Sequence, residues 1–253
     1  MLVQSQNFKQ TNSVGNAYTA VDFFNTWAID EIILLDVTRH TEDREQLHQN
    51  LRELSKRCFV PLTVGGRISS VEDIKELLRE GADKVAINTN AVEDPELVQE
   101  ASRTFGNQCI VISIDARRNS EGSYEVIVDR GGKPSGFSPS FWARKAEELG
   151  AGEVFLTSID NDGMRNGYDL ELIKSVSSAV NIPVIASGGV GNWQHLVDGI
   201  EKGGADAVSA ANIFHYSEQS TKKAKDYMKG AEINVREPEF YNVKIPRRPR
   251  YVV

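Results

Sequence analysis

The chain has 253 residues, of which 40% are hydrophobic and 26% charged, and its formal net charge is −7. This length can bury a large core and is typical of a single α/β barrel, so we expect one domain. The negative charge argues against nucleic acid as a general partner, because phosphate backbones are bound by concentrated Lys and Arg.

Cysteine and histidine are sparse. Cys58 and Cys109 are the two cysteines, which fits a reducing compartment, and the four histidines are scattered. Neither residue type shows metal-ligand spacing, so we predict no metal and no cofactor. The sequence contains no 18-residue apolar run and no signal-type segment, and we expect a cytoplasmic protein without membrane contact.

Helix and strand patterns alternate along the chain. After a short polar segment, residues 1–10, an apolar spacing predicts a helix over 17–27. Strands are expected at 31–37, 61–64, 84–87, 109–115, 153–159, 184–186 and 207–210. Helices are expected between and after them, at 44–57, 71–80, 95–105, 139–149, 170–178, 193–202 and 221–228. This alternation predicts a parallel sheet with crossover helices.

The second half of this pattern repeats the first. Residues 184–190, VIASGGV, form an apolar run with a glycine pair, and residues 204–211, GADAVSAA, follow. Residues 61–66, PLTVGG, and 81–89, GADKVAINT, match them with an offset of 123 (189 − 66 and 206 − 83). The chain therefore contains two copies of a β-α-β-α-β plan.

The repeat predicts an α/β fold, a (β/α)8 barrel of two half-barrels, over residues 1–236. Because the first predicted element is a helix, the opening strand of such a barrel is missing or truncated in this sequence. A start codon placed too late, or a trimmed chain, is the favoured explanation, and an open or rearranged barrel is the other. Residues 237–253 are predicted to form a solvated basic tail, with a partner or anion contact as the lesser alternative.

An insertion lies between the expected strand at 109–115 and the helix at 139–149. Its turn residues, 119–123, are followed by alternating β-branched residues in 124–128. This pattern predicts a small hairpin over the mouth of the barrel.

In an α/β barrel the functional residues lie at the carboxyl ends of the strands and in the loops after them. This rule selects Asp36, Gly65, Gly66, Asn88, Thr89, Asp115, Thr157, Asp160, Asp162, Gly163, Ser187, Gly188, Gly189, Ala211 and Asn212. Asp115 stands out because it ends the most apolar strand, where burial raises a carboxyl pKa and suits an acid or a base. The alternative is a helix N-cap or a salt-bridge partner of Arg117 or Arg118.

Two glycine-pair loops, at Gly66 and at Gly188 and Gly189, predict phosphate sites, because bare backbone N–H groups can approach an anion. Two such loops at one barrel mouth suit a long substrate with a phosphate at each end. The Asp-rich segment 158–163 has the composition of a ligand loop, although ordinary turns share it.

At the opposite, amino-terminal ends of the strands the sequence places Asp30, Glu31, Asp83, Lys84 and Glu153. A barrel normally has only packing and solvent there, so this charge cluster is a candidate site. Structural salt bridges across the barrel bottom are the alternative.

Several stretches together are specific to one family. They are 63–66 (TVGG), 81–89, 114–116 (IDA), 150–153 (GAGE), 156–163 (LTSIDNDG), 167–169 (GYD), 185–189 (IASGG) and 213–215 (IFH). From about residue 7 to residue 236, the chain resembles the cyclase (synthase) subunit of imidazole glycerol phosphate synthase, from histidine biosynthesis. That family is a (β/α)8 barrel of two half-barrels, in agreement with the repeat.

The resemblance implies an enzyme that takes ammonia from a glutaminase partner, in a heterodimer docked at the barrel bottom. The implied substrate is a bisphosphorylated ribulosyl-formimino aminoimidazole carboxamide nucleotide, and the products are imidazole glycerol phosphate and an aminoimidazole carboxamide ribotide. By position, Asp115 matches one of two catalytic aspartates, and Glu31, Lys84 and Glu153 match three of four residues around the ammonia entrance. The implied phosphate-binding residues are Gly66, Asn88 and Thr89 at one site and Asp162, Gly163, Gly188, Gly189, Ala211 and Asn212 at the other.

The chain departs from the family pattern at several positions. The other catalytic aspartate and the fourth gate residue, an arginine, belong to the first strand, and Gln4 replaces the lysine that follows it. Arg67 replaces the third glycine of a Gly-Gly-Gly turn and either supplies a cation to the phosphate or obstructs it, and Asn212 replaces a serine. These departures leave open a paralogous ammonia-delivering subunit for amidination of surface-polysaccharide sugars.

Two further alternatives are a catalytically silent barrel that activates a glutaminase and the sister phosphoribosyl isomerase. The isomerase gives no reason for the charges at the barrel bottom. The sequence contains no cysteine in a Gly-x-Cys-x-Gly elbow, so we expect ammonia to come from a partner or from solution.

Overall fold

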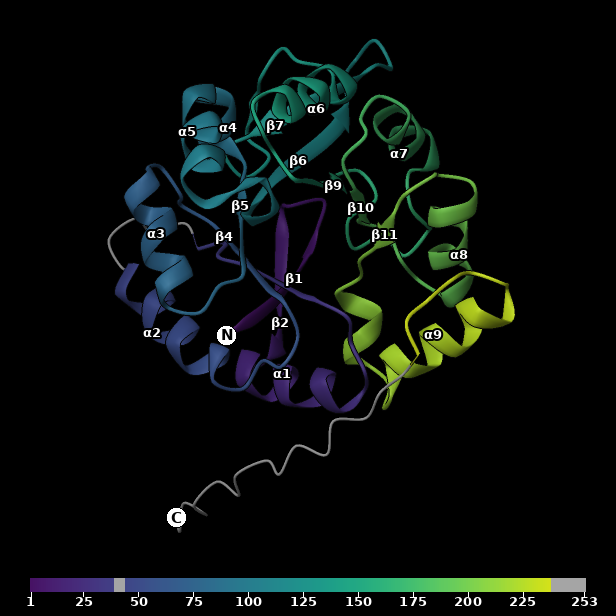
Figure 1. Cartoon of the computed structure of the whole chain (residues 1–253). Coiled ribbons are helices and arrows are strands. Elements are labelled where there is room, and N and C mark those ends of the chain that lie inside the picture. Colours follow the sequence, from purple (N-terminus) through teal and green to yellow (C-terminus); the bar gives the residue numbers. More distant parts are fainter. Residues whose placement is uncertain (39–43, 238–253) are drawn as a thin grey trace.

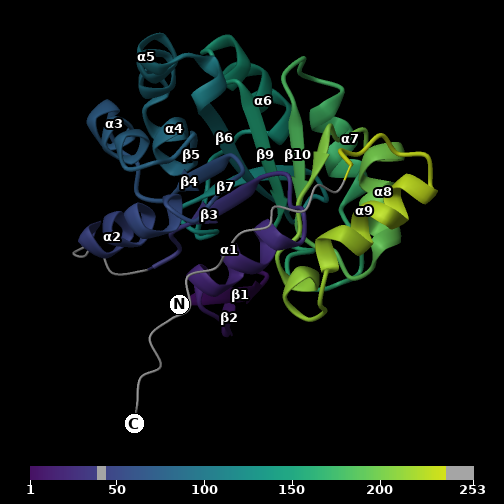
Figure 2. The ribbon, with the colours of Figure 1, turned by 60° about the horizontal axis from the view of Figure 1, so that its bottom comes forward.

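The computed structural model describes residues 1–38 and 44–237. Its centre is a parallel sheet with the strand order β11-β10-β9-β6-β5-β4-β3, surrounded by helices as Figures 1 and 2 show. The strands are β3 (Ile32–Leu35), β4 (Leu62–Gly65), β5 (Lys84–Ile87), β6 (Ile110–Arg118), β9 (Glu153–Ser158), β10 (Val184–Ser187) and β11 (Ala207–Val208). The seven apolar runs that predicted strands are confirmed.

Helices follow the strands at the predicted places. They are α1 (Ala17–Thr26), α2 (Arg44–Ser55), α3 (Val71–Arg79), α5 (Pro95–Phe105), α6 (Pro139–Glu148), α7 (Leu170–Ser177), α8 (Trp193–Glu201) and α9 (Ser220–Gly230). Pro95 and Pro139 occupy first turns, where a missing N–H costs no hydrogen bond. The short helix α4 (Thr89–Glu93) adds to the predicted set. No described helix is long and apolar enough to cross a membrane.

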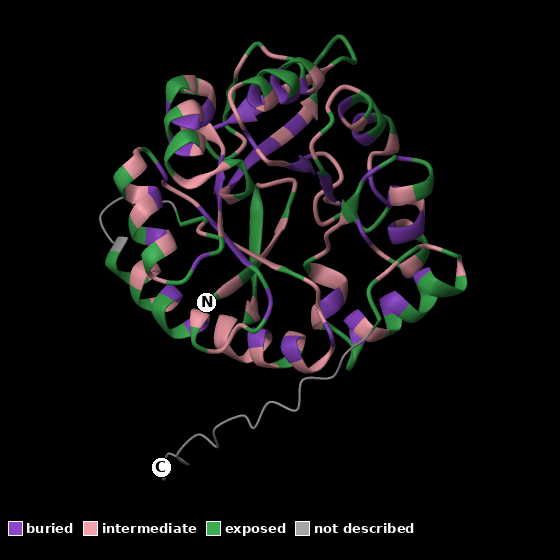
Figure 3. Ribbon diagram, in the orientation of Figure 1, coloured by how far each residue is buried: buried purple, intermediate pink, exposed green. Residues whose placement is uncertain are grey.

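The middle strands of the sheet are buried on both faces (Figure 3). Val64, Ile112 and Leu156 pack toward the helices and are at most 1% exposed. A smaller inner cluster is formed by Ala86, Val111, Phe155 and Ile185. Burial on both faces explains why these strands are continuous hydrophobic runs in the sequence.

The end strands, β3 and β11, do not pair with each other in the described residues. They are also less buried than the middle strands, since Leu35 in β3 is 39% exposed. The chain is therefore an α/β fold of the (β/α)8-barrel type, in which the two end strands of the described sheet are not joined by hydrogen bonds.

The two half-barrels share one hydrogen-bonding register. Ile32 in β3 pairs with Leu62 in β4, and Val154 in β9 pairs with Val184 in β10. Equivalent residues of these strands are therefore 122 apart (154 − 32 and 184 − 62). This register confirms the internal repeat at the level of backbone pairing.

Two aspartates mark the same repeat on the neighbouring strands. The Asp83 carboxylate accepts the N–H of Leu62 at 2.8 Å, and the Asp206 carboxylate accepts the N–H of Val184 at 2.9 Å. The predicted offset of 123 holds for this aspartate pair (206 − 83). Asp83 thus serves the backbone of its own half-barrel rather than the charge cluster at the barrel bottom.

For the glycine loops the predicted offset is wrong by one residue. A Cβ on Gly66 would lie 2.6 Å from the Asp36 carbonyl oxygen, and one on Gly188 would lie 2.7 Å from the Ser158 carbonyl oxygen. Each glycine thus makes the same close approach to the preceding strand, 122 residues apart (188 − 66). The residue equivalent to Gly189 is consequently Arg67.

Two antiparallel hairpins accompany the parallel sheet. β1 (Leu2–Gln6) and β2 (Gln10–Gly15) form a hairpin that overlaps the centre of the ring of helices in the view of Figure 1 and lies at one end of the molecule, below α1, in Figure 2. The polar sequence there gave no sign of this hairpin. β7 (Tyr124–Val128) pairs with the end of β6 and with β8 (Lys133–Pro134), which confirms the hairpin predicted in the insertion. The predicted basic tail lies, from residue 238 on, outside the described residues.

Candidate active site

Asp115 lies near the carboxyl end of β6, the central strand of the sheet. Its carboxylate accepts a hydrogen bond from Asn88 Nδ2 at 3.2 Å, and the same amide donates to the Ser113 carbonyl at 2.9 Å. Burial, with a smaller contribution from the charge of Asp162, raises the pKa of Asp115 to about 7. A carboxyl group with this pKa can accept or donate a proton near neutral pH.

The arginines beside Asp115 are engaged elsewhere. Arg117 Nη2 donates to the Gly131 carbonyl at 3.3 Å, and Arg118 Nη2 bonds with Glu171 at 2.5 Å. Asp115 also lies within a strand rather than at a helix start. For the part of the chain that is described, the alternatives of a helix cap and of a salt bridge to these arginines are wrong.

Asp162 lies in the loop after β9, against the N-terminal hairpin. The Ser5 hydroxyl hydrogen bonds to its carboxylate, and the Asn7 N–H donates to its carbonyl at 3.0 Å. Asn7 Nδ2 also donates to two carbonyls of the same loop, at 3.1 and 2.7 Å. Burial raises the pKa of Asp162, and the Ser5 hydrogen bond opposes this rise. The hairpin therefore holds this loop in place and bonds directly to its carboxylate.

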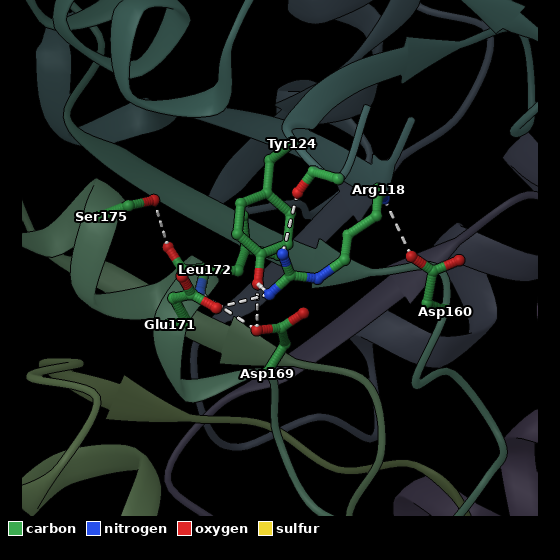
Figure 4. A network of polar contacts seen from close by, with 8 residues as sticks. Arg118, Tyr124, Asp160, Asp169, Glu171, Leu172 and Ser175 are labelled. Carbon is green, nitrogen blue, oxygen red and sulfur yellow. Dashed lines mark hydrogen bonds and ion pairs between the residues drawn. The ribbon is translucent and has the colours of Figure 1, made fainter. Parts of the chain in front are cut away.

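A polar network fixes the other side of the same loop (Figure 4). Asp160 accepts the backbone N–H of Arg118 at 2.9 Å. The Arg118 guanidinium lies 4.2 Å from the centre of the Tyr124 ring and pairs with Glu171. The Tyr124 hydroxyl donates to Asp169 at 2.6 Å, and Asp169 caps α7. The β6–β7 hairpin is thereby tied to α7 and to the loop after β9.

The loop after β10 presents bare backbone at the carboxyl end of the sheet. Gly188 and Gly189 have φ of 93° and 104°, and a Cβ on Gly189 would lie 2.1 Å from the Gly167 carbonyl oxygen. No hydrogen bond within the described residues takes the N–H of Gly163, Gly188 or Gly189. These groups are therefore available to an anion, which backbone N–H groups bind readily.

Asn212 follows Ala211 and faces the loop after β9. Its Oδ1 accepts a hydrogen bond from Arg165 Nη2 at 3.4 Å. Its Nδ2 is buried and donates no hydrogen bond to any described residue. Buried amides are normally satisfied, so this group is a candidate contact for a ligand or water.

In the loop after β4, which is equivalent to the loop after β10, Arg67 takes the position of Gly189. Arg67 has φ of 56°, and its Nε lies 3.3 Å from Asp36 Oδ2, while its Nη2 hydrogen bonds to Thr38. The side chains of Arg67 and Asp36 are only 12% and 10% exposed.

Asn88 and Thr89 follow β5, where Thr89 Oγ1 accepts an N–H from the turn after β7 at 3.0 Å.

At the amino-terminal ends of the strands, Lys84 joins two glutamates. Its Nζ lies 2.5 Å from Glu153 Oε1 and 3.2 Å from Glu31 Oε2. Burial acts to lower the pKa of Lys84, but the hydrogen bonds and charges of Glu153 and Glu31 outweigh it and raise the pKa. Glu153 Oε2 is buried and accepts no hydrogen bond from a described residue. Asp30 pairs instead with Lys225 at 2.7 Å.

The predicted site residues thus fall into two groups at opposite ends of the strands. The group at the carboxyl ends comprises Gly66, Asn88, Thr89, Asp115, Asp162, Gly163, Gly188, Gly189, Ala211 and Asn212. The group at the amino-terminal ends comprises Glu31, Lys84 and Glu153. Sequence reasoning missed Ser5 and Asn7, because a short polar segment carries no signal that it folds over a distant loop.

The chain matches, over residues 1–220, the family model described as histidine biosynthesis protein, and it belongs to that family of α/β barrels. A protein of Vibrio vulnificus (strain YJ016), named "Putative imidazole glycerol phosphate synthase subunit hisF2", is 47% identical over 236 residues. The match covers 93% of this chain and 86% of that protein. The family resemblance predicted from the sequence is confirmed.

Proposed function

We propose that the chain is the ammonia-using barrel subunit, the cyclase, of imidazole glycerol phosphate synthase, a lyase of histidine biosynthesis. The observation that carries the proposal is the position of Asp115 on the central strand, where its carboxyl group is hydrogen bonded to Asn88 and burial raises its pKa. Asp162 lies close enough to raise that pKa, and glycine loops flank the strand on both sides. This arrangement suits proton transfer on a phosphorylated acceptor.

In this function the acceptor is a bisphosphorylated ribulosyl-formimino aminoimidazole carboxamide nucleotide. Ammonia is added, and imidazole glycerol phosphate and an aminoimidazole carboxamide ribotide are released. Asp115 moves the proton, with Asn88 as its hydrogen-bonding partner. One phosphate binds at Gly163, Gly188 and Gly189, whose N–H groups lack protein acceptors among the described residues, and the other is assigned to Gly66, Asn88 and Thr89.

Ammonia comes from a glutaminase subunit that docks at the amino-terminal ends of the strands and forms a heterodimer with this chain in the cytoplasm. The partner face contains Lys84 between Glu31 and Glu153. Charged groups at this end, joined by hydrogen bonds, suit an ammonia entrance better than a purely apolar barrel bottom would. The opposite end then holds the acceptor, as active sites of such barrels do.

A second candidate acceptor is a sugar of a surface polysaccharide, amidinated by a paralogous complex of the same kind. The observation that favours it is the Arg67–Asp36 pair, which occupies the place of a bare loop. A catalytically silent barrel that only activates the glutaminase is the remaining alternative.

The test supplies ammonium and the bisphosphorylated nucleotide to the purified chain and follows the loss of substrate absorbance. The expected result is ammonium-dependent turnover that falls by about 10²-fold or more in Asp115→Asn. A chain that stimulates glutamine hydrolysis by a glutaminase, yet consumes neither this nucleotide nor, in a parallel assay, a surface-polysaccharide sugar, would contradict an enzymatic role.

A further inference from the structure

The two glycine loops at the carboxyl ends of the strands are equivalent by backbone but not by side chain. Gly66 and Gly188 make the same close approach, to Asp36 O and to Ser158 O. The next residue in each loop has a positive φ, 56° for Arg67 and 104° for Gly189. One of these two residues carries a long cationic side chain and the other none.

The left-handed conformation is strained for a non-glycine residue, so contacts of the Arg67 side chain have to compensate. Its guanidinium contacts the segment that follows β3: Nε is 3.3 Å from Asp36 Oδ2, and Nη2 hydrogen bonds to Thr38 Oγ1 and lies 3.4 Å from its carbonyl oxygen. The guanidinium therefore turns toward the preceding strand, while Asn88 and Thr89 lie on the following one.

The charge of the first loop differs accordingly. Asp36 is only 10% exposed, and its carboxylate neutralises Arg67 within the protein. A phosphate at this loop would have to compete with that carboxylate for the guanidinium and would also meet its negative charge. In the second loop the equivalent residues, Ser158 and Gly189, carry no charge. The backbone N–H group of Gly66, like those of Gly188 and Gly189, has no described acceptor, so the two loops differ in charge rather than in this backbone donor.

We infer that Arg67 closes the first loop to phosphate and that the acceptor of this chain carries a phosphate only at the end bound by the second loop. The inference rests on the part of the proposed function that makes this chain an ammonia-using subunit with one phosphate held at the second loop, and it selects the second of the two acceptors proposed above. It narrows the acceptor class from a molecule with phosphates at both ends to one whose other end is uncharged. Arg67 is then a specificity-determining residue, and the sugar acceptor becomes the better candidate.

The experiment is a titration of the full ¹⁵N-labelled chain with inorganic phosphate, followed through the backbone amide signals of Gly66 and Gly188. In the unmodified chain we expect a saturable shift at Gly188 and none at Gly66. Arg67→Gly gives the first loop the bare backbone of the second loop, and in this variant we expect a saturable shift at both Gly66 and Gly188. In Asp36→Asn, which frees the guanidinium from its carboxylate, a shift at Gly66 is expected as well.

Arg67→Lys is the matched control, since it keeps a cation and the left-handed strain but lacks the planar fork of arginine. We expect the shorter cation of this variant to leave the Asp36 carboxylate beside the loop, so the Gly66 amide should remain unshifted. A shift at Gly66 in the unmodified chain overturns the inference alone, as does an unshifted Gly66 in Arg67→Gly when Gly188 responds. An unshifted Gly188 in every protein overturns the phosphate-anchored acceptor itself, and with it this part of the proposed function.

Discussion

The half-barrels β3–β5 and β9–β11 share one backbone plan and differ in charge at both ends of their strands. At the carboxyl ends, Asp36 and Arg67 form an ion pair where the second half has Ser158 and Gly189. The main-chain register is the same in both halves. Backbone hydrogen bonds therefore define the repeat, while side chains at the strand ends distinguish the two loops.

At the amino-terminal ends the asymmetry has another form. Glu31 and Glu153 are equivalent, 122 residues apart (153 − 31), but Lys84 has Ala207 as its equivalent. One lysine thus bridges a carboxylate from each half. The repeat supplies two anions and a single cation, so this cluster exists only because the two halves differ.

The largest expected effect concerns the strand that lies between the halves. Asp115→Asn keeps the shape of the side chain and removes its proton-transferring carboxyl group, so ammonium-dependent turnover should fall by about 10²-fold or more. The assay is loss of absorbance of the bisphosphorylated nucleotide, in the unmodified and the Arg67→Gly backgrounds. Near-normal turnover of Asp115→Asn would remove Asp115 from the mechanism and leave the loops as the main distinction between the halves.

The same substitution should change how stability depends on pH. The pKa of Asp115 is about 7 in the folded chain against 3.8 without the protein environment. The folded chain therefore binds more protons between these values, and the free energy of unfolding falls as pH rises from about 4 to about 7. The full pKa shift corresponds to a decline of roughly 4 kcal/mol in the free energy of unfolding. Because Asp115 is partly exposed to solvent, we expect a decline of about 2 kcal/mol.

Denaturant unfolding at pH 4 and pH 8 measures this effect. The free energy of unfolding of Asp115→Asn should not show this decline. Relative to the unmodified chain, Asp115→Asn should therefore be more stable at pH 8 than at pH 4. Asp206→Asn is a useful control, because it alters a strand-end carboxylate of the repeat that hydrogen bonds to backbone. A difference between Asp115→Asn and the unmodified chain that does not vary with pH would contradict the raised pKa.

The parallel strands and their order of succession were predictable, because buried runs and helix caps are local signals. The placement of Asp115 near the carboxyl end of the sheet was also predictable, since it ends an apolar run in the sequence, although β6 continues to Arg118 and the catalytic role of Asp115 stays a prediction. The Ser5 and Asn7 contacts were not, because they join residues more than 150 positions apart through a polar hairpin. The sequence repeat aligned Gly66 with Gly189, which is wrong by one residue. Gly188 and Gly189 are consecutive, and only the close approach of Gly188 to Ser158 shows that Gly188 is the equivalent of Gly66.

A third prediction concerns Arg67 and the acceptor. Removing the side chain in Arg67→Gly should raise kcat/KM for the bisphosphorylated nucleotide by about tenfold, which corresponds to roughly 1.4 kcal/mol of restored phosphate binding. The gain should appear in KM rather than kcat, since Arg67 follows β4 whereas Asp115 lies on β6, with β5 between the two strands. An unchanged or lower kcat/KM would mean that Arg67 itself contributes to binding the second phosphate, and the two loops would then be functionally equivalent.

The smallest effect is expected at the barrel bottom, where Lys84 is a charged residue without a charged equivalent in the second half. Lys84→Met removes the cation between Glu31 and Glu153 without touching the carboxyl-end site. Lys225→Met is the matched control, because Lys225 is also a buried lysine paired with a carboxylate near the start of β3 but lies outside the cluster.

If ammonia enters at this cluster, glutamine-driven turnover with a glutaminase partner should fall by about fivefold in Lys84→Met or separate from glutamine hydrolysis, because the two carboxylates then repel and rearrange. Ammonium-driven turnover should stay nearly constant, since free ammonia can reach the acceptor from solution at the carboxyl ends of the strands, where the acceptor binds. The acceptor binds roughly 17–20 Å away, one strand length from the cluster, so its affinity should not change. Both half-reactions are measured with glutamine and with ammonium, for the unmodified chain and both variants. Equal rates in Lys84→Met and Lys225→Met would identify Lys84 as a structural salt-bridge residue, and the asymmetry at this end would then have no role in ammonia transfer.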